Sequence, residues 1–573
     1  MARHMDVVNP GRVLPPSFKP RIPQIELPQL PRHCAPNGLA SDDSPLPDKV
    51  DIRSIICAIQ QGETVDAVEK HLTYYDQLDA ENLQARINEK VEGLPAIFYI
   101  VHTDDVQMIR SWVKYGGNPA AVYEPTQFPL LAYAILHRRD ARTVQQATCT
   151  VETLLMLGAS PFVVPRAFYT PFSRKLPESG PTAAELTDSV REGQSWCAPF
   201  LGRGLVLALN ITQRYRLWQA SKIGTPSCRQ KFVASRSKAE SVFGLQYMIV
   251  GQSLAVEAIK SRLIAQLVLE SPKSLVFIFA GPSGHGKTEV ARGLGKLIST
   301  DMITIDCTTF RRENELFGPR PPYTGSQKGS PLNNFLASHS GRRGLVFMDE
   351  FEKTNQDIHN TLLIPFDQGE YLNRRDSIKI DCSKIIWILA TNRFDDNIHK
   401  FYEINRCDLA KSQNDQKKVA LTRQLVNDLK KECISYFGAP LAGRVSEIMP
   451  FLPFTPDEQA VIAYKAIMDL EAKLRQPVAV SQSGQIDNLV GNIRLSVDDD
   501  VRVSFAAAND SYMPQLGARS ILRDVTDAIR LPLVSQYLKS EEDINDNQAE
   551  AQFKVVLNAD NEIEVLRMKK RKH

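Results

Sequence analysis

A glycine-rich octapeptide is the strongest chemical feature of the sequence. It reads Gly281-Pro282-Ser283-Gly284-His285-Gly286-Lys287-Thr288, follows an apolar run at 275–280 and precedes a helix-forming stretch at 289–297. In such a strand–loop–helix context the glycines let backbone amides curl around phosphate oxygens, and the helix points its positive dipole end at them. We expect Lys287 to reach the β- and γ-phosphates and the Thr288 hydroxyl to coordinate Mg²⁺. All eight residues are assigned to this nucleotide site, although His285 stands at a variable position and receives no role of its own.

Two further apolar runs end in polar residues. The run at 345–348 ends in Asp349 and Glu350, and the run at 385–390 ends in Thr391 and Asn392. The carboxyl ends of parallel strands meet at one edge of a sheet, so these residues are expected beside the glycine-rich loop. Asp349 is then the expected Mg²⁺ partner and Glu350 the base that polarises the attacking water. Asn392 is the amide expected to hold that water.

These residues need a sheet to position them, and the pattern around them provides one. From about residue 241 onward, apolar strands alternate with helical stretches. This alternation is typical of an α/β fold with a parallel sheet that helices cover on both faces.

Composition excludes several classes of protein. The chain has 573 residues, of which 43% are hydrophobic and 24% charged, so two or three folded domains are expected rather than global disorder. A formal charge of +3 disfavours a strong nonspecific polyanion binder. The nine cysteines are scattered without a C-x-x-C pair, which argues against a zinc knuckle and a disulfide framework. No apolar run approaches the roughly 18 residues of a membrane-spanning helix.

The first 47 residues are rich in proline and show no helical or strand period. Proline at this density prevents regular hydrogen bonding, so we expect a flexible extension. The segment has neither the apolar core of a secretory signal nor an amphipathic helix suited to a mitochondrial presequence. A cytoplasmic or nuclear location is therefore expected, and a mitochondrial one is less favoured.

Residues 48–225 have a helical pattern with a weak repeat. Two units each begin with a proline (Pro95, Pro129), continue through two helices and close on a glycine turn (Gly116, Gly158). The prolines are expected at the first helical position, and the glycines are expected to end the second helices in a left-handed conformation. The prolines are 34 residues apart and the turns 42, so the second unit needs an insertion, most simply at 138–148. The units resemble ankyrin repeats, whose period is about 33 residues; a generic helical bundle is the alternative.

The candidate nucleotide-site residues and their flanking motifs together resemble those of an AAA+ ATPase of the Clp family, ClpB type. Asp349-Glu350-Phe351-Glu352-Lys353 is similar to the family's D-E-I-E-K, and Ile249-Val250-Gly251-Gln252 is similar to its V-I-G-Q. The resemblance covers roughly residues 245–540. With one P-loop and the repeats before it, the chain also resembles the single-ring, ankyrin-fused members of the family in animal mitochondria.

This resemblance implies roles for further residues. Ile249 and Val250 would pack on the adenine of ATP. Arg444, in a segment similar to F-x-P-E-F-L-N-R, would be an arginine finger that acts on the nucleotide of a neighbouring subunit. Arg519, in Gly517-Ala518-Arg519, would reach the nucleotide from a C-terminal lid.

One loop of the resemblance concerns the substrate. Residues 318–325 are similar to the family's G-x-P-P-G-Y-V-G, in which the aromatic faces a central pore and grips a threaded polypeptide. Tyr323 is that aromatic here, whereas Pro322 and Thr324 replace a glycine and a valine. An apolar ring suits many sequences because its contact is nonspecific. The alternative is that Tyr323 packs on its own proline-rich loop.

The predicted fold is thus an AAA+ P-loop domain with a C-terminal lid, preceded by an all-α, ankyrin-like repeat domain. The expected segments are 1–47 (extension), 48–225 (repeat domain), 226–240 (linker), 241–455 (ATPase core), 456–560 (lid) and 561–573 (basic tail).

The predicted function is an ATP hydrolase that uses ATP and Mg²⁺ to unfold or disaggregate protein. The resemblance implies a homo-hexameric ring, with misfolded or aggregated polypeptide as substrate, and the repeats are expected to bind a protein partner. Two alternatives stay open. One is an ATPase that remodels nucleic acid, against which the near-neutral charge speaks although the tail 569–572 is basic. The other is a scaffold in which nucleotide only orders the ring.

Overall fold

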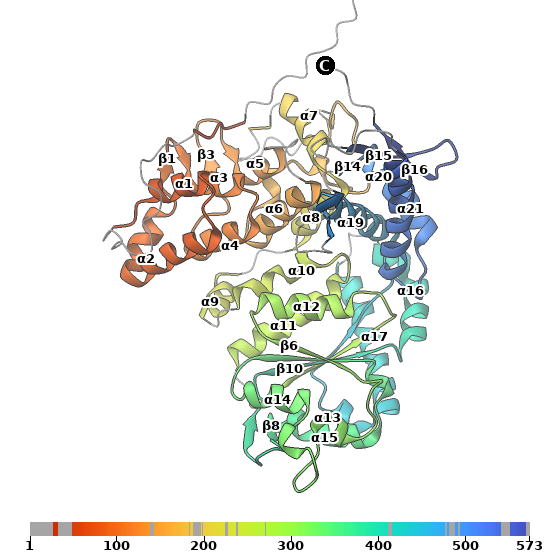
Figure 1. Cartoon of the computed structure of the whole chain (residues 1–573). Helices are drawn as coiled ribbons and strands as arrows, with labels where there is room; N and C mark the ends of the chain where they lie inside the picture. Colours follow the sequence, from red (N-terminus) through yellow and green to blue (C-terminus); the bar gives the residue numbers. More distant parts are fainter. Residues whose placement is uncertain are drawn as a thin grey trace, which may run out of the picture.

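The chain forms a helical-repeat region, an α/β core and a C-terminal lid (Figure 1). The computed structural model describes residues 27–31, 49–137, 143–182, 184–186, 196–197, 199–223, 227–236, 239–269, 271–410, 415–475, 478–480, 487–490, 493–539 and 551–568. Nearly all of the expected extension, and residues 569–573 of the expected basic tail, lie outside these ranges. Among the helices that the structure describes, none is both long and apolar enough to cross a membrane.

The repeat region consists of helix pairs joined by short hairpins. Its helices are α1 (Ile52–Gln60), α2 (Val65–Arg86), α3 (Ala96–His102), α4 (Val106–Lys114), α5 (Leu130–Leu136), α6 (Val144–Met156), α7 (Pro199–Ala208) and α8 (Ile211–Lys222), with 3-10 turns at Pro161–Val163 and Arg166–Phe168. The hairpins are β1 (Lys90–Val91) with β2 (Leu94–Pro95) and β3 (Val122–Tyr123) with β4 (Phe128–Pro129). Both predicted units therefore contain two helices, α3–α4 and α5–α6.

The details of the repeat differ from the prediction at the prolines. Pro95 and Pro129 are the N-cap residues of α3 and α5, one position before the predicted first helical residue, because each proline also ends a strand of its hairpin. Gly116 and Gly158 have φ of 107° and 105°, the expected left-handed conformation. The extra length of the second unit is shared between a longer connection before α6 and a longer second helix, 13 residues in α6 against 9 in α4.

A five-stranded parallel sheet forms the centre of the α/β core. Its strands lie in the order β11-β5-β10-β7-β6 and span Glu447–Pro450 (β11), Leu275–Ala280 (β5), Ile385–Thr391 (β10), Gly344–Asp349 (β7) and Met302–Asp306 (β6). The three predicted strands are the central ones, and β6 and β11 are edge strands that the sequence analysis missed. A separate hairpin joins β8 (Glu370–Leu372) to β9 (Lys379–Asp381).

Helices cover both faces of this sheet because β5 is apolar on both. Val276 and Ile278 belong to one buried cluster, whereas Phe277 and Phe279 belong to another on the opposite face. The helices of the core are α9 (Cys228–Arg236), α10 (Leu245–Met248), α11 (Ser253–Val268), α12 (Lys287–Leu297), α13 (Glu313–Phe317), α14 (Pro331–Ser338), α15 (Gln356–Gln368), α16 (Asp395–Ala410), α17 (Asp415–Phe437) and α18 (Ala439–Ala442). Helix α9 lies in the segment expected as a linker and contacts α11.

The lid is a helical layer with a small sheet. It contains α19 (Pro456–Leu474), α20 (Asp500–Ser511), α21 (Ala518–Leu538), the hairpin β12 (Val478–Val480) with β13 (Asp487–Val490), and a sheet of β14 (Ile493–Val497), β15 (Ala551–Leu557) and β16 (Ile563–Arg567). Strand β16 pairs with β15, so residues 563–567 belong to the lid and not to a separate tail as the sequence analysis expected.

The repeat region packs directly against the lid, and Figure 1 shows α6 and α8 beside α19. Ile211 and Tyr215 of α8 share one buried cluster with lid residues such as Ile467 and Val503. Between the two parts, the side chain of Gln145 donates to Asp469 at 2.7 Å. The repeat region and the lid therefore share a common hydrophobic core.

Candidate functional site

The glycine-rich loop connects the end of β5 to the start of α12, as predicted. Gly281, Gly284 and Gly286 have φ of 152°, 73° and 92°, conformations that L side chains rarely adopt. Within the described part of the chain, none of the backbone N–H groups of residues 283–288 donates a hydrogen bond to another protein group. Unpaired amides at the N-terminus of an 11-residue helix form an anion cradle. The loop therefore fits the phosphates of a nucleotide.

Lys287 is folded back onto the loop that carries it. Its ammonium donates to the carbonyls of Gly281 and Pro282, the latter at 3.0 Å, and to Oδ1 of Asn392 at 2.7 Å. Burial lowers the pKa of Lys287 to about 8, although the nearby carboxylates of Asp395 and Asp349 oppose the shift. A buried ammonium held mainly by neutral oxygens is well placed to exchange them for phosphate oxygens.

The three predicted strand ends meet as expected. Strand β10, which ends directly before Asn392, lies between β5 and β7, so Asn392 separates the loop from Asp349 and Glu350. Glu350 has φ of 51°, a left-handed conformation for a residue with a side chain, and its N–H donates to Oδ1 of Asp349 at 3.1 Å. Such backbone strain clusters at functional sites. The side chains of Thr288, Asp349 and Glu350 are half-buried at this edge, an arrangement that suits a magnesium ion with an attacking water.

Two acids near Lys287 were missed by the sequence analysis. Oε1 of Glu352 accepts from the backbone N–H of Asn392 at 3.3 Å, and its Oε2 is buried with no hydrogen-bond partner among the described residues. Oδ1 of Asp395 is likewise buried and unpaired there, and burial raises the pKa of Asp395 to about 6. Glu352 lies within the motif Asp349–Lys353, and the motif gave it no separate role. Asp395 could not be recognised from the sequence because acids are common in the first turn of a helix.

Arg519 extends from the lid to the phosphate loop, and its contact with a nucleotide stays a prediction. Its Nη1 donates to Oγ of Ser283 at 3.0 Å, and the N–H of Ala518 donates to the carbonyl of Gly284 at 3.0 Å. A Cβ on Gly517 would lie 2.7 Å from the carbonyl oxygen of Gly284. The lid is therefore closed onto the phosphate loop through a contact that only glycine permits.

His285 turns away from the cradle and into the joint between core and lid. Its ring stacks on Phe454 with centroids 5.1 Å apart, Nδ1 lies 2.9 Å from the carbonyl oxygen of Ser283, and Nε2 lies 3.4 Å from the Tyr512 hydroxyl. Burial, with a smaller contribution from Lys287, lowers the pKa of His285 to about 4. Only the backbone of His285 belongs to the nucleotide site; its side chain joins the loop to the lid.

Ile249 and Val250 lie in the segment between α10 and α11, with 5% and 8% of their surfaces exposed. They share buried clusters with different parts of the molecule, Ile249 with the sheet and Val250 with the lid. Their predicted role against adenine is compatible with this position between core and lid. It stays a prediction.

Arg444 lies at the opposite edge of the sheet from Lys287. It precedes β11, and the N–H of Ser446 donates to the carbonyl of Val276 near the start of β5, whereas the phosphate loop follows the end of β5. A strand of six residues is roughly 20 Å long, so Arg444 is remote from the phosphate loop of its own chain. Its guanidinium instead donates to the Pro440 carbonyl at 2.7 Å and pairs with Asp367 at 3.3 Å.

Tyr323 lies on the connection between β6 and β7 and is 72% exposed, so its ring does not pack on its own loop. The base of that loop is fixed. Arg374, which is 7% exposed, donates to the Gly318 carbonyl and pairs with Glu313, both at 3.1 Å. The loop therefore presents an aromatic side chain from a rigid base.

The sheet order, the loop and the three polar strand ends define a P-loop ATPase domain of the AAA+ class. Residues 272–448 match the family model described as "AAA domain (Cdc48 subfamily)", so this part of the chain is an AAA domain. The match implies nucleotide binding and, with the relatives below, supports the predicted ATP-hydrolysing enzyme.

More particularly, the chain is similar to ClpB proteins. The chaperone protein ClpB of Chlamydia muridarum is 29% identical over 306 residues, which cover 52% of this chain and 32% of that protein. ClpB of Chlamydia pneumoniae is 26% identical over 306 residues, 52% of this chain and 32% of that protein. ClpB of Staphylococcus aureus (strain COL) is 26% identical over 308 residues, 52% and 31% of the two chains. The chain thus spans about a third of the length of these curated relatives.

Proposed function

We propose that this protein is an ATP-dependent protein unfoldase or disaggregase of ClpB type. It hydrolyses ATP at the interfaces of a homo-hexameric ring and threads misfolded or aggregated polypeptide through a central pore. The observation that carries the proposal is the exposed Tyr323 on a fixed loop of an AAA domain whose relatives are chaperones named ClpB.

The catalytic part of the proposal uses the residues at the edge of the sheet. The unpaired amides of 283–288 and Lys287 bind the phosphates of ATP, and Thr288 and Asp349 hold Mg²⁺. The metal neutralises charge on the phosphate oxygens. Glu350 takes the proton of the attacking water, and Asn392 orients that water.

The position of Arg444 supports the proposed ring. Roughly 20 Å of sheet separates this residue from its own phosphate loop, so its charge can serve a transition state only on another copy. An interface that joins two different faces of a subunit repeats head to tail, and it closes into a ring when the rotation between neighbouring subunits allows closure. In other nucleotide hydrolases an arginine supplied in this way accelerates hydrolysis by about 10³–10⁵.

The remaining parts of the chain receive roles that fit their surfaces. Lid movement, transmitted through Arg519, displaces Tyr323 along the pore. The two-helix repeats, which we propose to be ankyrin-like, bind a protein partner.

The decisive experiment measures ATP-driven refolding of a heat-aggregated reporter enzyme. Tyr323→Ala should keep basal ATP hydrolysis and lose refolding, whereas Tyr323→Phe should keep both because the apolar ring is retained. Tyr74→Ala, which removes a half-exposed tyrosine of the repeat region, is the matched control and should behave as wild type. Unchanged refolding by the Tyr323→Ala variant would refute the pore assignment.

A second variant separates the motor from a scaffold. Glu350→Gln should bind ATP as wild type does and fail to hydrolyse it, because only the water-activating carboxylate is changed. Refolding should stop with hydrolysis. A wild-type protein that binds ATP without turnover, or a Glu350→Gln variant that still supports refolding, would instead favour the scaffold.

A further inference from the structure

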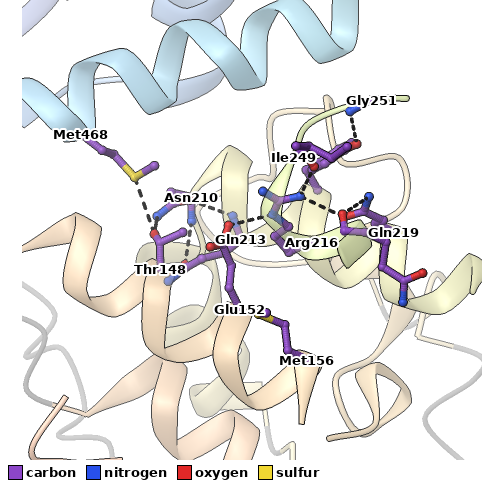
Figure 2. A network of polar contacts seen from close by, with 12 residues as sticks. Thr148, Glu152, Met156, Asn210, Gln213, Arg216, Gln219, Ile249, Gly251 and Met468 are labelled. Atoms are coloured by element: carbon purple, nitrogen blue, oxygen red, sulfur yellow. Dashed lines mark hydrogen bonds and ion pairs between the residues drawn. The ribbon is translucent and has the colours of Figure 1, made fainter. Parts of the chain in front are cut away.

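Helix α8 of the repeat region holds the backbone of the segment between α10 and α11 (Figure 2). Nη1 of Arg216 donates to the carbonyl of Ile249 at 2.6 Å, and the N–H of Gly251 donates to the Tyr215 hydroxyl at 2.9 Å. One turn further along α8, the side chain of Gln219 donates to the carbonyl of Gln246 at 2.9 Å. Three side chains of one helix thus bind three backbone groups of residues 246–251.

The guanidinium of Arg216 is fixed from several sides. Its side chain is 1% exposed, pairs with Glu152 of α6 at 2.7 Å and donates to Oε1 of Gln219 at 3.0 Å. A buried cation with two oxygen partners besides Ile249 cannot follow a moving loop without losing hydrogen bonds. The segment 246–251 is consequently held to the repeat region and does not move freely with the core.

These contacts determine which groups of Val250 are free. Among the described residues the only cis peptide bonds precede Pro171 and Pro322, so both peptide bonds of Val250 are trans. In a trans peptide the N–H and C=O point in opposite directions. The carbonyl of Ile249 and the N–H of Gly251 point at α8, so the N–H and C=O of Val250 point away from it. In the described chain these two groups have no hydrogen-bond partner.

We propose that Tyr215 and Arg216 are positioning residues for the base of the nucleotide, so that the repeat region forms part of the ATP site. They orient Val250 to present one donor and one acceptor, which matches the acceptor N1 and the donor N6 of adenine. The inference rests on the proposed ATP site and adds a selectivity for the base that depends on α8. Both residues lie on α8, outside the phosphate loop.

Helix α8 also binds the lid, so it connects two parts of the molecule that surround the proposed ATP site. The N–H of Ile211 and Nη2 of Arg214 both bind Oδ2 of Asp500, at 2.5 and 3.2 Å. Helix α8 therefore contacts both the base-binding segment and the lid. A partner that displaced α8 would change ATP affinity without approaching the phosphate loop.

The test compares two probes that share the phosphate site and differ in the base. Dissociation constants for ATP and for inorganic tripolyphosphate are measured by titration calorimetry on the full chain. Arg216→Met should weaken ATP binding about tenfold or more, because ATP must then order Val250 itself at a cost set by the lost charge-assisted hydrogen bond to Ile249. The affinity for tripolyphosphate should change less than twofold. Tyr215→Phe should act in the same direction. In steady-state hydrolysis the KM for ATP should rise while kcat changes little.

Two further variants separate positioning from folding. Arg216→Lys keeps a cation that can donate to Ile249, so it should recover most of the ATP affinity. Arg110→Met removes another partly buried arginine of the repeat region, one that contacts Met156 and not the segment 246–251, and should bind both probes as wild type does.

Equal weakening of ATP and tripolyphosphate by Arg216→Met, or unchanged ATP affinity, would overturn the positioning role. Failure of the wild-type protein to bind ATP would instead overturn the proposed function, so the two failures are distinguishable.

Discussion

Acid should open the lid, because between about pH 4 and pH 6.5 His285 is neutral only while the lid covers it. The ring is fully buried between Phe454, Tyr512 and the phosphate loop, and its pKa is lowered from 6.5 to about 4. The nearby charge of Lys287 also disfavours a positive charge on the ring. When the lid departs, the ring meets water and regains an ordinary pKa.

The effect of pH on lid opening follows from the linkage between protonation of His285 and lid closure. A histidine whose pKa is depressed in the closed state stabilises that state fully above pH 6.5, and the contribution is lost as the pH falls toward about 4. Between pH 7.5 and pH 5 the free energy that favours the closed lid over the open lid should fall by about 2 kcal/mol. The equilibrium constant for lid opening should then rise roughly 30-fold. Below about pH 4 no further loss comes from this group.

Hydrogen exchange of the peptides that cover the phosphate loop and residues 509–519 measures this opening. Protection factors, corrected for the intrinsic pH dependence of exchange, should fall about 30-fold for wild type relative to His285→Gln over that pH range. His359 is the matched control. Its pKa is also lowered to about 4 by burial, but it packs against Phe351 and Phe437 in the core.

His359→Gln should therefore leave the pH dependence of lid exchange as in wild type. If His285→Gln and wild type lose protection equally, the ring is not released when the lid opens. If His359→Gln removes as much of the pH dependence as His285→Gln does, the exchange reports global unfolding and the reasoning about the lid is wrong.

Three other predictions concern the contact between lid and phosphate loop, the lysine of that loop and the arginine Arg444. Gly517→Ala should raise exchange of the lid at least tenfold, since its Cβ would meet Gly284 at 2.7 Å; Gly62→Ala, whose Cβ would meet nothing within 4 Å at φ 95°, should cost only the backbone strain of about 1–2 kcal/mol. Lys287→Met should abolish ATP binding in calorimetry yet leave the thermal stability of the nucleotide-free protein unchanged or higher, because burial already disfavours the ammonium. Arg444→Ala should lose hydrolysis, and mixing it with the Lys287→Met protein should restore about a quarter of the wild-type rate if the finger acts between subunits of a randomly mixed ring; no recovery would mean that Arg444 acts elsewhere.

The central strands were predictable because burial on both faces produces uninterrupted apolar runs. Strand β5 begins and ends where its run does, and β7 and β10 extend theirs by one or two residues. The edge strands lack that signal. Strand β6 mixes half-buried with exposed residues and has no fully buried one, and β11 has four residues and ends in Pro450, so neither forms an uninterrupted apolar run.

The residues of the candidate site likewise fall into a predictable and an unpredictable group. Residues whose backbone or charge must meet phosphate follow strands at fixed spacing, and the structure brings Lys287, Asn392, Asp349 and Glu350 to one edge as predicted. Contacts between residues far apart in the chain follow no fixed sequence spacing. Asp395 reaches Lys287 across 108 positions and Tyr215 reaches Gly251 across 36, and nothing in either local sequence indicates the partner.

The position of α8 bears on how a ring of such subunits would use its repeats. A partner-binding module on a flexible tether could recruit substrate without altering hydrolysis. Here the repeat region shares a hydrophobic core with the lid, binds Asp500 through Arg214 and holds Ile249 through Arg216. A ligand that displaced α8 would break charge-assisted hydrogen bonds at the segment 246–251 or at the lid. If ATP binds against that segment as proposed, linkage is reciprocal, and ATP changes the affinity of the repeats for that ligand by the same factor.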